Sequence, residues 1–256
     1  TQMSAIRINT EVIKQIPALM GEVDLLKTVQ LMPGVSTSGE GFSGFNVRGG
    51  SADQNLILLD EATVYNPSHL MGFFSVFNSD AIRDMTVYKG DIPAEYGGRL
   101  SSLLDIRMKD GNMKKFAGAG GLGTISSRLT LEGPIIKDKA SFIVSGRRTY
   151  ADMFLGLAKD SALQNNQLYF YDFNMKANAI INDKNRLFVS GYFGRDVFAF
   201  QEMVDMGWGN HTYTVRLNTV LNEKLFSNTS LIYSNYDYEI NTSQDAGSFG
   251  DFSWKS

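Results

Sequence analysis

Cysteine is absent from the 256 residues of the chain, which excludes disulfide bonds, thiolate nucleophiles and cysteine-ligated metals. Histidine is scarce: only His69 and His211 are present, so a zinc site would need carboxylate ligands at spacings that the sequence lacks. We therefore expect no structural metal and no cofactor. A strong net charge is missing as well, and the formal value of -3 provides no basic field for a phosphate backbone. This argues against nucleic acid as a partner.

Long apolar runs are also missing. No stretch approaches the roughly 18 to 20 continuous apolar residues that a membrane-spanning helix needs, which excludes a helical membrane protein. The first residues lack the basic segment and apolar core of a signal peptide, so we expect the chain to begin downstream of any targeting sequence. Proline contributes only 5 residues, whereas glycine contributes 25 and aromatic residues make up 12%. This composition favours many β-strands joined by tight turns.

The spacing of apolar and polar residues along the sequence changes near residues 110–115. Before this point, apolar positions at helical spacing predict a helix over residues 22–32 that ends at Pro33. Beyond it, alternating strands with polar turns dominate. The sequence therefore predicts an α+β domain at residues 1–113 and a β-rich domain at residues 114–256. Strand-like runs in the first domain are expected at residues 45–48, 55–60, 85–89 and 103–108.

Strict apolar alternation marks the second domain, most clearly over residues 169–181 and again over residues 213–221 and 125–131. A soluble antiparallel sandwich alternates in the same way. However, the strand at residues 168–182 is longer than the usual five or six residues, whereas transmembrane strands need about nine to eleven. Its length therefore favours a membrane barrel.

The connections and the aromatic residues agree with a barrel. Short turns are expected at residues 134–139, 182–185 and 222–224 and long polar loops at 149–167 and 200–211, an asymmetry typical of outer-membrane barrels. We count about seven strands, too few to enclose a domain, so the predicted antiparallel transmembrane β-barrel is incomplete in this chain. Aromatic pairs near strand ends would form a membrane-interface girdle: Tyr169 with Tyr171, Tyr192 with Phe193, and Tyr233 with Tyr236.

Three ordered sets of residues in the first domain resemble the plug of TonB-dependent outer-membrane receptors. The first set runs from Ile16-Pro17-Ala18 to Met32-Pro33-Gly34-Val35. The second holds Phe45-Asn46-Val47-Arg48-Gly49-Gly50 and Val64-Tyr65-Asn66-Pro67, and the third holds Val87-Tyr88-Lys89-Gly90 and Tyr96-Gly97-Gly98-Arg99. The resemblance implies a gram-negative outer-membrane protein whose plug fills a barrel of about 22 strands.

The same resemblance implies particular partners. The energy transducer TonB is expected to pull on a short box upstream of Thr1, the barrel is expected to contact outer-membrane lipid, and the family likeness allows a surface lipoprotein. In similar proteins, plug arginines pair with acidic groups on the barrel wall. The matching positions are Arg48 and Arg99, beside glycine pairs whose backbone is free to turn inside a crowded lumen. A solvated surface charge is the alternative for each arginine.

Catalysis is not indicated. Residues 118–123 match the G-x-G-x-x-G dinucleotide fingerprint by letter, but the segment after them alternates as a strand instead of opening a helix. Asp60 and Glu61 are adjacent and would point to opposite faces of a strand, so they do not form a glycosidase pair. We expect a protein that is not an enzyme.

The leading functional hypothesis is import of a scarce nutrient that binds between outer loops and the apex of the plug. The expected binding stretches are residues 36–44 and 64–74, and packing inside the plug is the alternative for Met71, Phe73 and Phe74. A surface receptor that captures ligand without transport is the second hypothesis, and a soluble hydrolase the third. The substrate stays open among iron chelates, cobalamin, oligosaccharides and peptides. The residues proposed to touch it are Tyr65, Asn66, His69, Met71 and Phe73.

Overall fold

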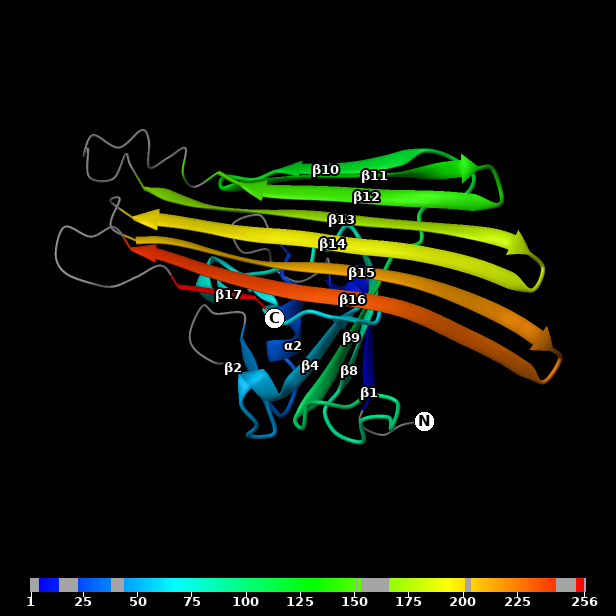
Figure 1. The fold of residues 1–256 in the computed structure, drawn as a ribbon, viewed down its shortest axis with the longest axis horizontal. Helices are drawn as coiled ribbons and strands as arrows, with labels where there is room; N and C mark the ends of the chain where they lie inside the picture. The colour runs from blue at the N-terminus through cyan, green and yellow to red at the C-terminus, as the bar shows by residue number, and fades with distance from the viewer. Residues whose placement is uncertain are drawn as a thin grey trace.

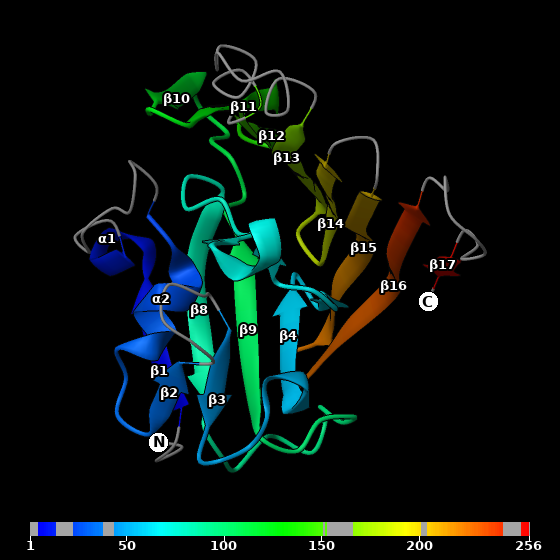
Figure 2. The same cartoon turned by 90° about the vertical axis from the view of Figure 1, so that its left-hand side faces the viewer.

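The computed structural model describes residues 5–13, 23–37, 44–150, 152, 166–200, 204–242 and 252–255. An N-terminal unit of short strands and helices lies beside one long, curved sheet, which we call the wall (Figure 1). Viewed from the end of the long strands, the wall arcs past the N-terminal unit (Figure 2). Three predicted segments lie wholly or mostly outside the described residues: residues 16–18, the predicted binding stretch 36–44 and the predicted loop 149–167.

The N-terminal unit is built on a five-stranded mixed sheet in the order β1-β8-β9-β4-β5. Strands β4 and β9 run parallel, while β8 and β9 pair antiparallel at the centre. The one helix and the four strands predicted in this part of the chain are confirmed within a few residues of their ends. The elements of the sheet are β1 (Ala5–Asn9), β4 (Asn55–Leu59), β5 (Ala62–Thr63), β8 (Ile82–Tyr88) and β9 (Ser102–Met108), with α1 (Thr10–Ile13) and α2 (Leu25–Gln30).

Two small hairpins complete the unit. The first joins β2 (Val35–Thr37) to β3 (Phe45–Val47). The second joins β6 (Ser68–His69) to β7 (Phe74–Ser75) across a 3-10 turn, η2 (Leu70–Gly72). A further 3-10 turn, η1 (Ala52–Gln54), leads into β4.

The core of the N-terminal unit lies between α2 and the central strands. Leu25, Leu26 and Val29 on α2 are fully buried because helical spacing places them on one face. Asp24 caps this helix: its Oδ1 accepts from the amides of Leu26 (2.8 Å) and Lys27 (3.3 Å). Its Oδ2 accepts from the Ser75 amide at 2.8 Å, so one carboxylate ties α2 to the second hairpin.

Replacing Asp24 by alanine is expected to destabilise the N-terminal unit by about 2 kcal/mol, because the helix loses its cap and the buried Ser75 amide loses its acceptor. Thermal unfolding of the full-length protein in detergent measures the change. Asp24→Asn keeps one acceptor oxygen and should lose roughly half as much. Equal melting of Asp24→Ala and the wild type would contradict this role.

The wall is an antiparallel meander of eight strands, β10 to β17, each bonded to its neighbour in sequence. Four of its strands have 16 to 19 residues, more than the nine to eleven that cross a bilayer. The count is eight where about seven were predicted. The strands are β10 (Ala117–Leu122), β11 (Ser126–Ile136), β12 (Ala140–Thr149), β13 (Gln167–Asn182), β14 (Asn185–Phe200), β15 (Val204–Asn222), β16 (Leu225–Thr242) and β17 (Phe252–Lys255).

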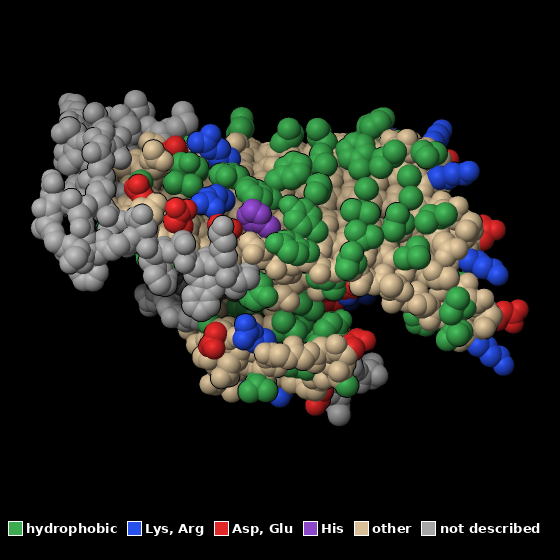
Figure 3. Space-filling model, viewed as in Figure 1, with side chains coloured by type: hydrophobic (Ala, Val, Ile, Leu, Met, Phe, Trp, Pro, Cys, Tyr) green, Lys and Arg blue, Asp and Glu red, His purple; other side chains and the backbone are tan. Residues whose placement is uncertain are grey.

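The two faces of the wall differ as the alternation predicts. On β13, Asp172, Asn174 and Lys176 turn inward and are buried against the N-terminal unit, whereas Phe173 and Met175 turn outward. The outer face carries a broad apolar area (Figure 3). Within the described residues it is uncovered, so the sandwich alternative fails. The exposed apolar residues of this face include Leu129, Leu131, Phe173, Met175, Val189, Tyr213, Val215, Leu217, Leu231 and Tyr233.

The apolar area has the height of a bilayer core. On β13 it extends from Tyr171 to Ile181, and ten residues of strand tilted by about 40° span roughly 25 Å. At one edge of the wall, the turn end, the short turns carry charges such as Asp183 and Lys184. The opposite edge, the loop end, carries the longer connections.

Two expectations for the second domain are wrong. The long loop at residues 200–211 is absent, because β15 already begins at Val204 and pairs with β14 along its whole length. Its outward positions there include Gly207 and Gly209, so the apolar alternation stops although the hydrogen bonds continue. Tyr192 does not belong to an interface girdle: it points inward and is buried.

Within the described residues, no helix has the length and apolarity needed to cross a membrane. The last strand of the N-terminal sheet ends at Met108 and the first strand of the wall begins at Ala117. The predicted boundary after residue 113 falls in this connection.

Candidate functional site: the apex loop and the plug–wall interface

The second hairpin and the residues before it form a loop over residues 65–75, which we call the apex loop. Its backbone is unusual, because Leu70, Met71 and Gly72 all have positive φ angles, of 48°, 56° and 110°. Such angles are costly for bulky residues and persist only where the surroundings impose them. The loop displays apolar side chains: Met71 is 53% exposed, and Phe73 and Tyr65 are each 47% exposed.

His69 anchors this loop to the wall. It was expected to face a ligand, but it is 1% exposed, and both ring nitrogens are occupied, so this expectation is wrong. Nδ1 lies 2.6 Å from Asp196 Oδ2 and Nε2 lies 2.6 Å from Asp172 Oδ1. The next amide, of Leu70, donates to Asp196 Oδ1 at 2.7 Å. The strained loop is thus fixed by two inward carboxylates of β13 and β14.

Arg147 completes the group, which we call the anchor cluster (His69, Arg147, Asp172, Asp196). Its Nε donates to Asp172 Oδ2 at 2.8 Å, and its Nη2 donates to the Ser75 carbonyl at 2.7 Å. The Tyr192 hydroxyl donates to Asp172 Oδ1 at 2.7 Å. The Phe170 ring stacks on His69 at 4.1 Å between centroids and lies 5.0 Å from the Arg147 guanidinium. Three strands of the wall therefore hold one hairpin of the N-terminal unit.

The anchor cluster is electrically neutral only when His69 is protonated, since two cations then face two carboxylates. Burial alone would lower the pKa of His69, but the charges of Asp172 and Asp196 and the hydrogen bonds to both outweigh it. The result is a pKa raised from 6.5 to about 9. An imidazolium donates from both nitrogens, which is the arrangement that the two 2.6 Å contacts require.

Attachment of the apex loop is expected to depend on pH. Because the pKa of His69 is raised in the docked state, its contribution is complete below pH 6.5 and is lost as pH rises through about 9, a change of up to about 3 kcal/mol. Hydrogen–deuterium exchange of residues 67–75 in the full-length protein, corrected for intrinsic rates, measures it. His69→Gln should remove the dependence in this window. A wild-type exchange pattern that stays constant across the window would contradict this account.

A second ionic contact lies toward the turn end, at the turn between β4 and β5. Asp60 and Glu61 both have positive φ, 45° and 77°, in this two-residue turn. Lys176 of β13 lies 3.2 Å from Asp60 Oδ2. Arg216 Nη1 of β15 donates to Glu61 Oε1 at 2.8 Å, and Ser230 of β16 donates to Glu61 Oε2 at 2.5 Å.

Glu61 is held as a carboxylate. Burial would raise its pKa, but hydrogen bonds from Ser230, Arg216 and Arg107 lower it below the usual value. Arg107, on β9 of the same unit, donates to Glu61 at 3.0 Å. The turn therefore presents a fixed negative charge to two cations of the wall.

Further polar contacts join the N-terminal unit to the wall. Arg128 Nε of β11 donates to Asp80 at 2.8 Å, and Asn78 Nδ2 donates to Ser145 Oγ of β12 at 2.7 Å. Asn210 of β15 accepts from the amides of Tyr65 and Asn66 and donates to the Asn66 carbonyl at 2.7 Å. Ion pairs and hydrogen bonds of this kind hold two surfaces in register at little net gain in free energy, which suits a contact that can be released.

The two arginines that were predicted to pair with the wall, Arg48 and Arg99, are not among these contacts. Arg48 sits at the Gly90 turn of the N-terminal unit, and Arg99 is an exposed loop residue. Neither forms a hydrogen bond or ion pair with the described wall strands, so their predicted pairing stays a prediction. Three described ion pairs across the interface have the reverse polarity, with the cation on the wall: Lys176–Asp60, Arg216–Glu61 and Arg128–Asp80. His69 has the predicted polarity, because it pairs with two acidic groups of the wall. Residues missed at the sequence level are Arg147, Asp172, Lys176, Asp196 and Arg216, all charged residues at inward positions of alternating strands.

Residues 2–102 match the TonB-dependent Receptor Plug Domain. No curated protein sequence matches the chain. The fold is similar to that of the siderophore receptor PirA from Acinetobacter baumannii, with a TM-score of 0.70 and 16% identity over 99% of this chain and 43% of that one.

The outer membrane transporter YddB from Escherichia coli has a TM-score of 0.67 and 14% identity over 98% of this chain and 42% of its own. The hemophore receptor HasR of Serratia marcescens, solved with its hemophore HasA and heme, has a TM-score of 0.65 and 12% identity over 93% and 38%. The chain thus spans less than half the length of each. Residues 2–102 form a TonB-dependent receptor plug domain, and the strands that follow have the fold of the barrel wall of gram-negative outer-membrane receptors.

Proposed function

We propose that the chain is the plug and part of the barrel of an outer-membrane importer that TonB drives, and that it is not an enzyme. The carrying observation is the contact between plug and wall: a plug domain is held by ion pairs and hydrogen bonds against the polar face of strands whose other face is apolar. Lipid outside and water inside account for these two faces. TonB, reached through a segment outside this chain, would supply the work that releases the plug.

The loop end of the wall would face the outside of the cell, since long loops lie outside in such barrels. The apex loop would then meet an incoming nutrient. Its exposed Tyr65, Met71 and Phe73 offer an apolar and aromatic surface at the mouth of the lumen, and Asn66 adds polar groups beside it. PirA and HasR are receptors for a siderophore and for a heme-carrying protein, which favours an iron compound as the cargo class to test first.

Removing the exposed apex side chains is expected to weaken ligand binding. Tyr65→Ala and Phe73→Ala should each lower the affinity roughly tenfold, because each removes a large contact surface. Binding of candidate iron chelates to the full-length protein measures this. Leu31→Ala, at an exposed apolar residue after α2, is the matched control and should bind normally. Unchanged affinity in both apex variants would remove these residues from the site.

Release of the plug can be tested by tethering it. The chain has no native cysteine, so Asn78→Cys with Ser145→Cys introduces one thiol on each side of the interface. Joining them with a short bifunctional thiol reagent is expected to leave ligand binding intact and to abolish uptake by cells. Each single-cysteine variant, treated with the same reagent, should import normally.

Deletion of TonB in the native host provides the second arm of this test. Loss of uptake with retained binding supports active import. Uptake that survives either the deletion or the tether would contradict it, and binding without any uptake in the wild type would favour a surface receptor.

A further inference from the structure

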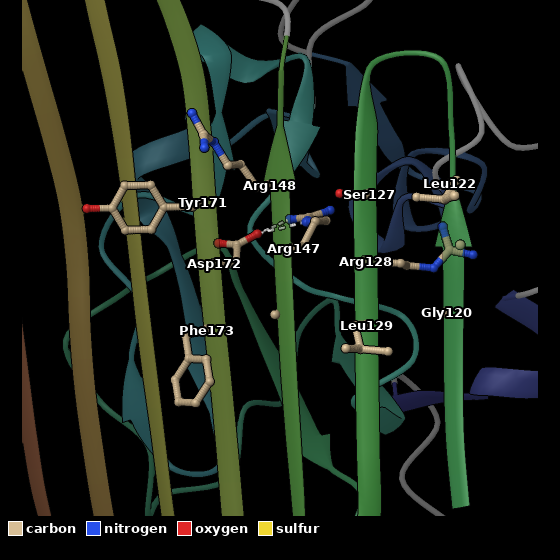
Figure 4. Close-up of a pocket in the computed structure, with 12 residues that line it drawn as sticks. Gly120, Leu122, Ser127, Arg128, Leu129, Arg147, Arg148, Tyr171, Asp172 and Phe173 are labelled. Atoms are coloured by element: carbon tan, nitrogen blue, oxygen red, sulfur yellow. Dashed lines mark hydrogen bonds and ion pairs between the residues drawn. The ribbon is translucent and has the colours of Figure 1, made fainter.

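An open groove of about 950 Å³ lies on the outer face of the wall, over β10 to β13. The neighbouring side chains come from two rows of outward residues defined by the strand register. The upper row, nearer the loop end, contains Leu122, Ser127, Arg148 and Tyr171. The lower row, nearer the turn end, contains Gly120, Leu129, Gly146 and Phe173. Figure 4 shows Leu129, Arg148, Tyr171 and Phe173 beside the groove, next to the inward pair Arg147 and Asp172.

Glycine makes the floor of this groove. Gly146 lies between Leu129 of β11 and Phe173 of β13, and both of these side chains are exposed. Without a side chain at Gly146, the two neighbours form walls on either side of β12. A Cβ built there meets nothing nearer than the Asp172 carbonyl oxygen, at 3.9 Å, so neither packing nor backbone requires glycine. The slot runs along β12 and is mostly apolar.

Arg148 closes the slot at the loop end, two residues along β12 from Gly146. Its side chain is 58% exposed, and its guanidinium lies 5.2 Å from the centre of the Tyr169 ring. The contact with Asp152 is long, at 3.6 Å, and leaves N–H donors of the guanidinium for another anion. This row lies at the upper limit of the apolar band, the level at which lipid headgroups meet the protein.

Arg195 provides an internal comparison. It occupies the same register row and the same face, on β14, but it lies 2.7 Å from Asp237 and 3.6 Å from Glu239. Two carboxylates therefore neutralise Arg195. The next outward residue of β14, Phe193, fills the position that Gly146 leaves open on β12. Of the two outward arginines in this row, Arg148 combines a weakly paired guanidinium with an apolar channel.

We propose that this groove binds one phosphorylated acyl lipid of the surrounding membrane, with an acyl chain over Gly146 and a phosphate on Arg148. A guanidinium matches phosphate oxygens in charge and in fork geometry, and a phosphate beside an apolar slot is the chemistry of a membrane lipid headgroup. The inference rests on the membrane placement proposed above. It adds a specific lipid site at which the barrel holds one lipid in register with β12.

The test is a lipid titration of the full-length protein in non-ionic detergent, followed by native mass spectrometry. Diphosphorylated lipid A is the probe, with the same lipid stripped of its phosphates and inorganic phosphate alone as comparison arms. The wild type should retain one lipid A, bind the dephosphorylated lipid about tenfold more weakly and ignore inorganic phosphate. Arg148→Gln should weaken lipid A binding by a similar factor.

Gly146→Leu fills the slot while leaving Arg148 in place, and it should also weaken binding at least tenfold. Arg195→Gln and Ala179→Leu are the matched controls: the first removes a charge in the same row, the second adds bulk to the outer face away from the groove. Both should bind as the wild type does. Heat-dependent migration on gels checks that every variant folds.

Three results would overturn the proposal: equal losses for Arg148→Gln and Arg195→Gln, unchanged binding in Gly146→Leu, or equal affinity for the dephosphorylated lipid. Binding of inorganic phosphate as tight as that of the lipid would replace it with a site for the free anion. These outcomes are separate from a failure of the proposed import. Uptake without TonB leaves the lipid titration unchanged, whereas a full-length protein that stays monomeric without detergent refutes the membrane placement itself.

Discussion

The contact that organises this structure is the buried pairing of His69 with Asp172 and Asp196. It holds a loop with three successive positive φ angles against three neighbouring strands of the wall, and Arg147 balances the remaining charge. When His69 is deprotonated, the cluster carries one uncompensated negative charge, and burying such a charge costs free energy. The position of the apex loop, and of every side chain that it displays, therefore depends on this one electrostatic balance.

The second constraint is the difference between the media on the two sides of the wall. Along one strand, Phe173 and Met175 meet the outer medium, while Asp172 and Lys176 meet the plug. A single strand can satisfy both only through its two-residue period. The plug contributes the complementary charges, Asp60 and Glu61, so that the cations on the inner face of the wall have carboxylate partners. The importer proposed above would use this asymmetry, with the outer face in lipid and the polar inner contact open to release.

Much of the fold could be predicted from the sequence because it depends on local pattern. Alternation over residues 169–181 located a wall strand and both of its faces, and Pro33 marked the end of α2. The failures have a common cause. Tyr192 and His69 were judged by residue type, whereas their roles depend on partners 20 and 103 residues away. Likewise β15 extends beyond the lipid band, where hydrogen bonding persists but the pattern that reveals a strand does not.

The meander of the wall has a consequence for assembly. Each strand pairs with its neighbour in sequence, so the contact order of the wall is low, whereas plug contacts such as Glu61 with Ser230 join residues 169 positions apart. Contacts between distant segments form late, because closing the long loop between them costs conformational entropy before the contact stabilises the fold. The wall hairpins can therefore form before the plug docks, because their strand-to-strand hydrogen bonds involve wall strands alone.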